Sequence, residues 1–329
     1  MQVLSDASYS SSFQVFSQSN PGNDYWLNTK TLQKKIETFL KKRYLSIAPI
    51  YILFILFYQI ISYYIATFNV EPFYKISHNP LSILANIFLL NGLDYQAFNN
   101  IVPGGWFIGT IFLFYLLFPL IYKLYRYIKT YNPRLLFLLP LGGVIVSAIF
   151  QTGIFFIIGD WTLSKPGSFT YYSIINQLPC MLIGVTLNYY LKNTKLSKNN
   201  LLLCFICLGL IGNLLWYALR LHYWIYALIP SIIGWSFFYL FLYVQRKSEE
   251  IRGGETVNNQ TRNYITKKIE QIGKVSFSVY FTNFIGTFIF PWGIQLLLVH
   301  YGYTINGTLL FFLLLIPIFL ITFLFVPPV

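Results

Sequence analysis

Long apolar runs, separated by short polar and charged stretches, dominate this sequence. Eight runs are long and apolar enough to cross a bilayer, since a membrane-spanning helix needs about 20 predominantly apolar residues. These predicted spans cover residues 45–69, 105–122, 135–159, 172–191, 200–218, 223–244, 274–299 and 306–327. The pattern predicts an all-α, polytopic integral membrane protein.

The remaining segments complete this predicted organisation. A further apolar run at 81–93 is too short to span, which predicts a re-entrant or interfacial segment. Residues 1–29 form a polar N-terminal segment, and 30–329 form the membrane domain. Residues 245–273 are polar and mixed in charge, which predicts a cytoplasmic linker within that domain.

The distribution of charge predicts how the chain is oriented. With eight spans, 20 of the 23 Lys and Arg residues fall on one side, and the other side holds Lys75, Lys165 and Arg220. If residues 81–93 also spanned, the four basic residues of 123–134 would move to the outer side. The positive-inside rule therefore predicts that both termini are cytoplasmic. The net charge of +13 then needs no nucleic-acid partner to explain it.

Metal, redox and ion-transport chemistry find little support in the residues. Each of the three histidines, His78, His222 and His300, lacks a second histidine at ligand spacing. The Cys204–Cys207 pair has no partner pair, so we expect no metal or redox site. Charged residues are nearly absent from the middle of the spans, which argues against a proton-coupled pump or an ion channel.

A basic run, Lys41-Lys42-Arg43, lies where a cytoplasmic segment enters the first span. Such a run is typical of a topology anchor whose side chains reach the interface. It is also suited to bind a phosphate-bearing donor such as coenzyme A. The residues alone leave both interpretations open.

Two other stretches interrupt the apolar pattern. Pro103-Gly104-Gly105-Trp106 precedes the second span, where the glycines permit a tight turn and Trp106 is typical of an interface anchor. Pro179 interrupts the span that contains QLPCMLIG, which indicates a kink or a cavity there.

Four segments together resemble the membrane-bound acyltransferase family 3, enzymes that O-acylate sugars and other hydroxyl acceptors. PGGWFIGTIFLFYLLFPLI is similar to that family's Pro-Gly-Gly-Trp-Ser-Ile-Gly stretch, and FLKKRYLSIAPIY is similar to its basic Arg-x-x-Arg motif. QLPCMLIGVTLNYYL and IGKVSFSVYFTNF resemble two further family helices. The order and spacing agree over roughly residues 35–290, which makes the resemblance specific for family but not for substrate.

The resemblance implies transfer of an acetyl-type acyl group from acyl-CoA to a hydroxyl of a glycan or lipid-linked sugar. Acyl-CoA would be a co-substrate, with no bound cofactor or metal. The location implied is a bacterial plasma membrane. The resemblance implies that the donor is bound by Lys41, Lys42 and Arg43. It implies that the acceptor cavity is lined by Trp106, Gln177, Tyr280 and Asn283.

The chain departs from the family pattern where polar chemistry is expected. Ser46 replaces the second arginine of the basic motif, Ile111 replaces a glutamate, and Asn283 replaces a histidine. The family's two first spans, which carry a further histidine, have no counterpart in the sequence. We therefore identify no general base and expect near-background turnover. The alternative is a non-catalytic carbohydrate exporter or membrane scaffold of the same fold.

Overall fold

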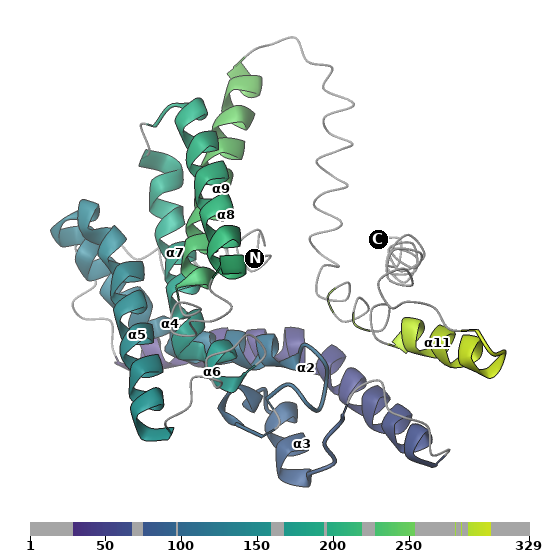
Figure 1. Cartoon of the computed structure of the whole chain (residues 1–329). Helices are drawn as coiled ribbons and strands as arrows, with labels where there is room; N and C mark the ends of the chain where they lie inside the picture. The colour runs from purple at the N-terminus through teal and green to yellow at the C-terminus, as the bar shows by residue number, and fades with distance from the viewer. Residues whose placement is uncertain are drawn as a thin grey trace. The chain divides into compact units, whose positions relative to one another are not determined.

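The computed structural model describes residues 29–67, 75–96, 98–158, 168–193, 196–218, 228–253, 280, 284 and 289–303. Every regular element within these ranges is helical, which confirms the all-α class (Figure 1). The chain divides into two compact units. The first unit contains Met1–Asn91, Gln96–Gly105 and Asn258–Val329, and the second contains Gly92–Tyr95 and Trp106–Val257.

The first unit is built on a long helix, α2 (Thr29–Thr67). Lysine residues are frequent in its first half, whereas Ile, Leu, Phe and Tyr dominate after Arg43. Many of these apolar side chains are exposed, including Leu53 at 65% and Ile60 at 56%. Because the stretch Lys34–Ile65 is long and apolar enough to cross a membrane, lipid is the natural partner of this surface. The helix begins well before the predicted span at 45–69.

The first part of the short apolar run at 81–93 forms a separate helix, α3 (Pro80–Ile87). Asn79 caps this helix, because its Oδ1 accepts a hydrogen bond from the Leu81 backbone N–H, and Pro80 fits the first turn. Eight residues of helix extend about 12 Å, far less than the roughly 30 Å of a bilayer core. The prediction of a short, non-spanning helical segment fits this geometry.

Two glycines let the chain turn sharply into α4 (Gly105–Tyr131). Gly104 has a φ of +80°, in the left-handed region that favours glycine. A Cβ at Gly104 would overlap the ring of Phe284, and a Cβ at Gly105 would overlap the hydroxyl of Tyr51. The tight turn predicted here is confirmed, and it is packed against aromatic side chains.

The second unit contains most of α4 and the helices that follow it. They are η4 (Pro133–Phe137), α5 (Leu138–Ile158), α6 (Phe169–Tyr172), α7 (Ile174–Asn193), α8 (Lys198–Ala218) and α9 (Ile229–Gly253). α7 packs against both α5 and α9, and α8 packs against α9. The first unit also contains α11 (Phe290–His300).

Small residues let the helices of the second unit approach one another. A Cβ at Gly143 of α5 would come within 3.2 Å of the Pro179 backbone of α7. Gly234 of α9 lies against Cys180 of α7, and the Cys180 thiol donates a hydrogen bond to the Pro230 carbonyl at 2.8 Å. Such close packing and interhelical hydrogen bonds hold helices together in lipid, where the hydrophobic effect is weak.

Four stretches of the described chain are long and apolar enough to cross a membrane. They are Lys34–Ile65, Gly105–Tyr131, Pro133–Ile154 and Lys198–Leu215. The predicted spans 172–191 and 223–244 overlap the helices α7 (Ile174–Asn193) and α9 (Ile229–Gly253), which are not among these four stretches. Half of the predicted span 274–299 and all of 306–327 lie outside the described residues. The eight-span topology therefore stays a prediction.

The end of α9 differs from the predicted boundary at residue 244. The helix continues to Gly253, through the first part of the predicted linker at 245–273. This part, QRKSEEIR, consists mostly of residues with good helix propensity, and no Gly or Pro interrupts it before Gly253. Hydropathy marks where a helix leaves the bilayer, and it says nothing about where the helix ends.

Candidate functional site

A network of polar side chains lies inside the second unit, among largely apolar helices. Asn176 of α7 is fully buried, and its Oδ1 accepts a hydrogen bond from the Ser147 hydroxyl of α5 at 2.7 Å. Its Nδ2 donates to the Tyr171 carbonyl of α6 at 2.8 Å. Buried Gln151 of α5 donates to the Thr170 carbonyl of α6 at 3.3 Å. These bonds offset the cost of burying polar groups and join α5, α6 and α7.

An aromatic pair lies beside this network. Trp106, in the first turn of α4, stacks on Tyr172 with ring centroids 4.0 Å apart and planes inclined by 22°. Thr110, one turn later, donates its hydroxyl to the Tyr172 carbonyl at 2.9 Å. Gln177 of α7 donates to the neighbouring Tyr171 carbonyl, also at 2.9 Å. The structure thus joins two predicted acceptor residues, Trp106 and Gln177, through two consecutive tyrosines.

We refer to Trp106, Tyr171, Tyr172 and Gln177 as the aromatic–amide cluster. All four side chains are half-buried, so part of each is accessible. Aromatic faces next to a small number of polar groups are the usual lining of sites for small molecules. The cluster contains neither a carboxylate nor an imidazole. It is suited to bind and orient a hydroxyl-bearing ligand, but it supplies no strong base.

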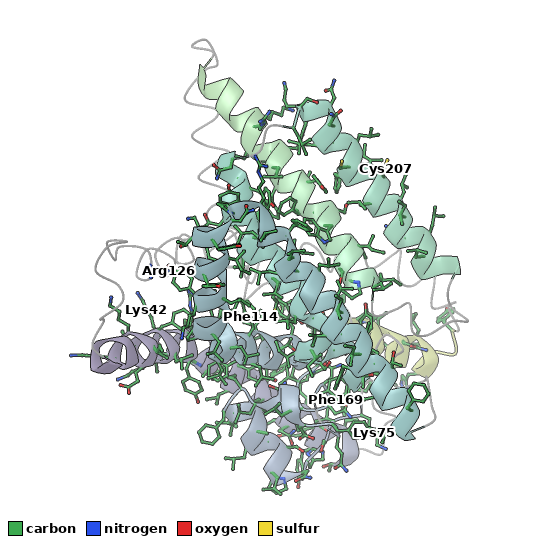
Figure 2. All side chains as sticks on the ribbon, turned by 90° about the vertical axis from the view of Figure 1, so that its left-hand side faces the viewer. Lys42, Lys75, Phe114, Arg126, Phe169 and Cys207 are labelled. Atoms are coloured by element: carbon green, nitrogen blue, oxygen red, sulfur yellow. The ribbon has the colours of Figure 1, made fainter. Side chains whose placement is uncertain are left out.

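The predicted donor residues lie together on α2. Lys41 and Lys42 are exposed (Lys42 is labelled in Figure 2), and the Arg43 guanidinium lies 5.5 Å from the centre of the Phe39 ring. Ser46, at the position of the motif's second arginine, donates its hydroxyl to the Arg43 carbonyl at 2.9 Å. The lysine ammonium groups are thus accessible, while Ser46 is bonded to the backbone of its own helix.

The remaining predicted positions, Tyr280, Asn283 and Ile111, are not part of the aromatic–amide cluster. Tyr280 belongs to the first unit, where its hydroxyl donates to the Gly104 carbonyl at 2.9 Å. Asn283 lies outside the described residues. Ile111, which occupies the family's glutamate position, is buried on α4 with 6% of its surface exposed. An isoleucine fits this apolar interior and has no polar group that could take part in catalysis.

The described ranges contain no group of three His, Cys, Asp or Glu residues able to hold a metal ion. All three cysteines are free thiols. The Cys180 thiol is bonded to the Pro230 carbonyl, whereas Cys207 is exposed on α8 (Figure 2).

Apolar helices of membrane-spanning length, held together by small residues and buried hydrogen bonds, define an all-α integral membrane protein. Residues 25–326 match the family model described as an acyltransferase domain, which covers nearly the whole chain. The chain therefore belongs to the acyltransferase 3 family, and the resemblance predicted from four segments is confirmed. It matches no curated protein and no solved structure.

Sequence reasoning missed the residues that organise the cluster. Ser147 lies within an apolar span, and Asn176 directly precedes Gln177. A polar residue inside a predicted span is itself a signal, because it needs a partner from another helix. The signal identifies Ser147 and Asn176 as candidates, but only the structure shows that they bond to each other.

Proposed function

We propose that the protein transfers a short, acetyl-type acyl group from acyl-CoA to a hydroxyl of a glycan or lipid-linked sugar. Family membership supports acyl transfer by a membrane protein in general. The observation that carries the donor assignment is the pair of exposed lysines, Lys41 and Lys42, beside Arg43 in the charged half of α2. Coenzyme A bears phosphate groups, which form strong charge-assisted hydrogen bonds with ammonium and guanidinium groups.

The aromatic–amide cluster is the proposed acceptor site. The stacked Trp106 and Tyr172 rings offer a flat apolar surface, which suits the apolar face of a sugar ring. Gln177 supplies amide groups that can hydrogen-bond sugar hydroxyls. Tyr280 belongs to the first unit and Asn283 lies outside the described residues, so a role of either in acceptor binding stays an expectation from the family resemblance.

The donor assignment is tested by acyl-CoA binding. The protein in nanodiscs is titrated with radiolabelled acetyl-CoA, and the double variant Lys41→Gln/Lys42→Gln is compared with Lys34→Gln/Lys35→Gln. Two charge-assisted contacts at about 1.5–3 kcal/mol each predict at least a tenfold weaker Kd for the first variant. The second variant removes the same charge from the same helix and should bind as the parent does. Equal Kd values for all three proteins would refute the assignment.

A non-catalytic role is the second candidate, and two observations favour it. Ile111 is buried and apolar, and Ser46 is bonded to the Arg43 carbonyl. Neither replaces the ionic group that the family motif carries at its position. This second candidate predicts that the purified chain transfers acetyl groups to sugar acceptors at near-background rates. Rapid, acceptor-dependent turnover would exclude the exporter or scaffold role.

A further inference from the structure

His78 connects the segment before α3 with the C-terminal half of α2, and both of its ring nitrogens are engaged. Its Nδ1 lies 2.6 Å from Oε1 of Gln59, and its Nε2 lies 3.2 Å from Oγ of Ser62. Gln59 in turn donates its Nε2 amide to the Ser77 carbonyl at 2.9 Å. All four residues belong to the first compact unit.

The hydrogen-bond pattern assigns the proton positions. A backbone carbonyl can only accept, so the Gln59 amide nitrogen faces Ser77 and the amide oxygen faces His78. Nδ1 of the neutral imidazole then carries the hydrogen, and Nε2 is left as the acceptor. The Ser62 hydroxyl therefore donates to Nε2. This is the order of a hydroxyl nucleophile, a general base and a residue that orients the base.

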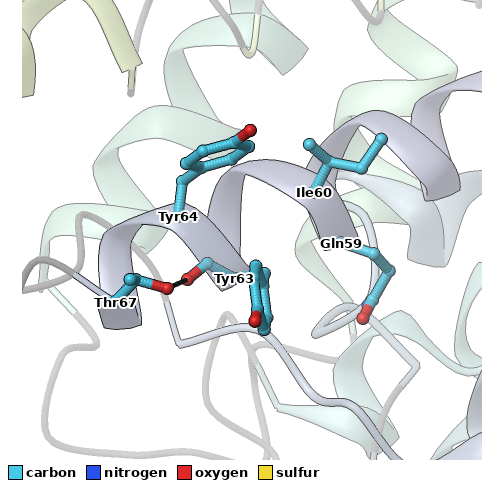
Figure 3. Close-up of a pocket in the computed structure, with 5 residues that line it drawn as sticks. All are labelled: Gln59, Ile60, Tyr63, Tyr64 and Thr67. Carbon is cyan, nitrogen blue, oxygen red and sulfur yellow. Dashed lines mark hydrogen bonds between the residues drawn. The ribbon is translucent and has the colours of Figure 1, made fainter.

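A groove adjoins this arrangement on α2. The described residues that line it are Gln59, Ile60, Tyr63, Tyr64 and Thr67, and its volume is about 540 Å³ (Figure 3). Gln59 thus both bonds to His78 and lines the groove. Ile60, Tyr63 and Tyr64 are all exposed, so the lining is accessible and mostly apolar. The groove begins within the candidate span Lys34–Ile65, where acyl chains of lipid would surround it.

We propose that Ser62, His78 and Gln59 form a second acyl-handling site, which takes acyl esters presented from the membrane. The acyl chain would occupy the groove, and its ester group would extend past Gln59 to reach Ser62 Oγ, which is not part of the groove lining. This inference goes beyond the proposed function, since it requires neither acyl-CoA nor the basic run of α2. Ser62 and His78 are the proposed catalytic residues, and Gln59 is a positioning residue.

The reaction is balanced without a cofactor. Ser62 Oγ attacks the ester carbonyl, the Oγ–C bond forms, and the Ser62 proton passes to His78 Nε2. The ester C–O bond breaks, and His78 returns that proton to the departing alcohol oxygen. A second hydroxyl, from water or an acceptor, then attacks the acyl-serine, and His78 takes its proton. The Ser62–acyl bond breaks, Ser62 recovers a proton from His78, and the acid or a new ester is released.

The test uses the full chain in nanodiscs and a fluorophosphonate probe, which forms a stable adduct with activated serines. We expect mass spectrometry of the parent protein to find the adduct mainly on Ser62. Adduct formation should be lost in Ser62→Ala and at least tenfold slower in His78→Gln, since a positioned base contributes about 10²–10⁴-fold. Ser46→Ala is the matched control, because it removes another α2 hydroxyl that is bonded to the backbone of its own helix.

Gln59 is tested by a pair of variants. Gln59→Leu removes the oxygen that orients His78 and should slow adduct formation several-fold, whereas Gln59→Glu keeps an acceptor oxygen and should restore the rate. The site would be refuted by a folded parent protein with no adduct on Ser62, or with adducts spread evenly over its exposed serines. An unchanged labelling rate in His78→Gln would also refute the proposed site, and His78 would then only hold the segment before α3 against α2. Acetyl-CoA binding, measured separately, reports on the proposed donor site alone.

Discussion

Individual side chains in this protein are constrained where the chain turns and where helices meet. At Gly104 the constraint is steric, because the backbone is left-handed and the ring of Phe284 occupies the space of a side chain. At Asn176 the constraint is polar, because both ends of its amide are bonded in a fully buried position. Substitutions at the two positions should therefore be costly for different reasons.

Gly104→Ala should destabilise the protein by about 2 kcal/mol or more. A left-handed conformation costs a residue with a Cβ about 1–2 kcal/mol, and displacing the Phe284 ring adds to that. The measurement is the thermal midpoint in detergent. Gly142→Ala is the control, because a Cβ there meets nothing within 4 Å. Since Gly142 lies in α5, this control should be neutral or stabilising by up to about 1 kcal/mol. Equal midpoints for the two variants would contradict the prediction.

Ser147 and Asn176 should be energetically coupled. We expect a double-mutant cycle of Ser147→Ala and Asn176→Leu to give a coupling energy of about 0.6–1.7 kcal/mol, between the average and the largest values found for hydrogen bonds between membrane helices. Denaturant-induced unfolding in mixed micelles measures it. A second cycle pairs Asn176→Leu with Ser236→Ala, whose hydroxyl is bonded to the Phe205 carbonyl instead. That cycle should be additive, and coupling of equal size in both cycles would contradict the assignment.

Among the helices, α3 depends on α2 for its position. The Tyr51 hydroxyl donates to Asn86 Oδ1 at 2.6 Å, and the Tyr44 hydroxyl donates to the Ile87 carbonyl at 3.1 Å. An isolated helix of eight residues is not stable in water, because nucleation is unfavourable and few bonds form. The contacts with α2 therefore hold α3 in its helical form.

Tyr51→Phe should loosen α3 without disturbing α2. A hydrogen bond of about 0.5–1.5 kcal/mol is lost and Asn86 Oδ1 loses this partner, so amide exchange in residues 81–93 should accelerate by up to about tenfold. Hydrogen–deuterium exchange with mass spectrometry measures this. Tyr58→Phe is the matched control, because its buried hydroxyl has no hydrogen-bond partner in the described structure. Unchanged exchange in Tyr51→Phe, or equal acceleration in the control, would show that the bond does not hold α3.

The sequence pattern predicted the apolar helices because the thickness of a bilayer sets their length. It did not predict that α2 starts before its span or that α9 continues beyond its span, because charged residues such as Lys and Glu extend a helix as readily as apolar ones do. Family motifs predicted Trp106 and Gln177 as site residues. The bond between Ser147 and Asn176 depends on how α5 and α7 are rotated toward each other, which hydropathy does not encode.

For the molecule as a whole, the asymmetry of charge is the main determinant of orientation. Under the eight-span topology, 20 of 23 basic residues lie on one side. The short length of α3 supports a topology in which residues 81–93 do not span, because a non-spanning α3 keeps residues 123–134 on the basic side. Lys75 and Arg134, both exposed, are then expected on opposite faces of the membrane.

Cysteine labelling tests this topology. In a variant without native cysteines, Lys75→Cys should react with an impermeant maleimide in intact cells, because it lies in the predicted outer segment. Arg134→Cys should react only after the membrane is permeabilised. Each substitution removes one positive charge, so the two variants are matched. Labelling of Arg134→Cys in intact cells would overturn the eight-span topology.

Cys207 lies near the middle of the candidate span Lys198–Leu215 and is exposed on α8. A nitroxide attached to this thiol would therefore serve as a depth marker at the centre of the bilayer. Its paramagnetic relaxation should be enhanced strongly by molecular oxygen, which is concentrated in hydrocarbon, and weakly by a water-soluble nickel chelate. A native thiol of the chain thus allows the depth of α8 in the bilayer to be measured. A nitroxide that responded mainly to nickel would place α8 outside the membrane.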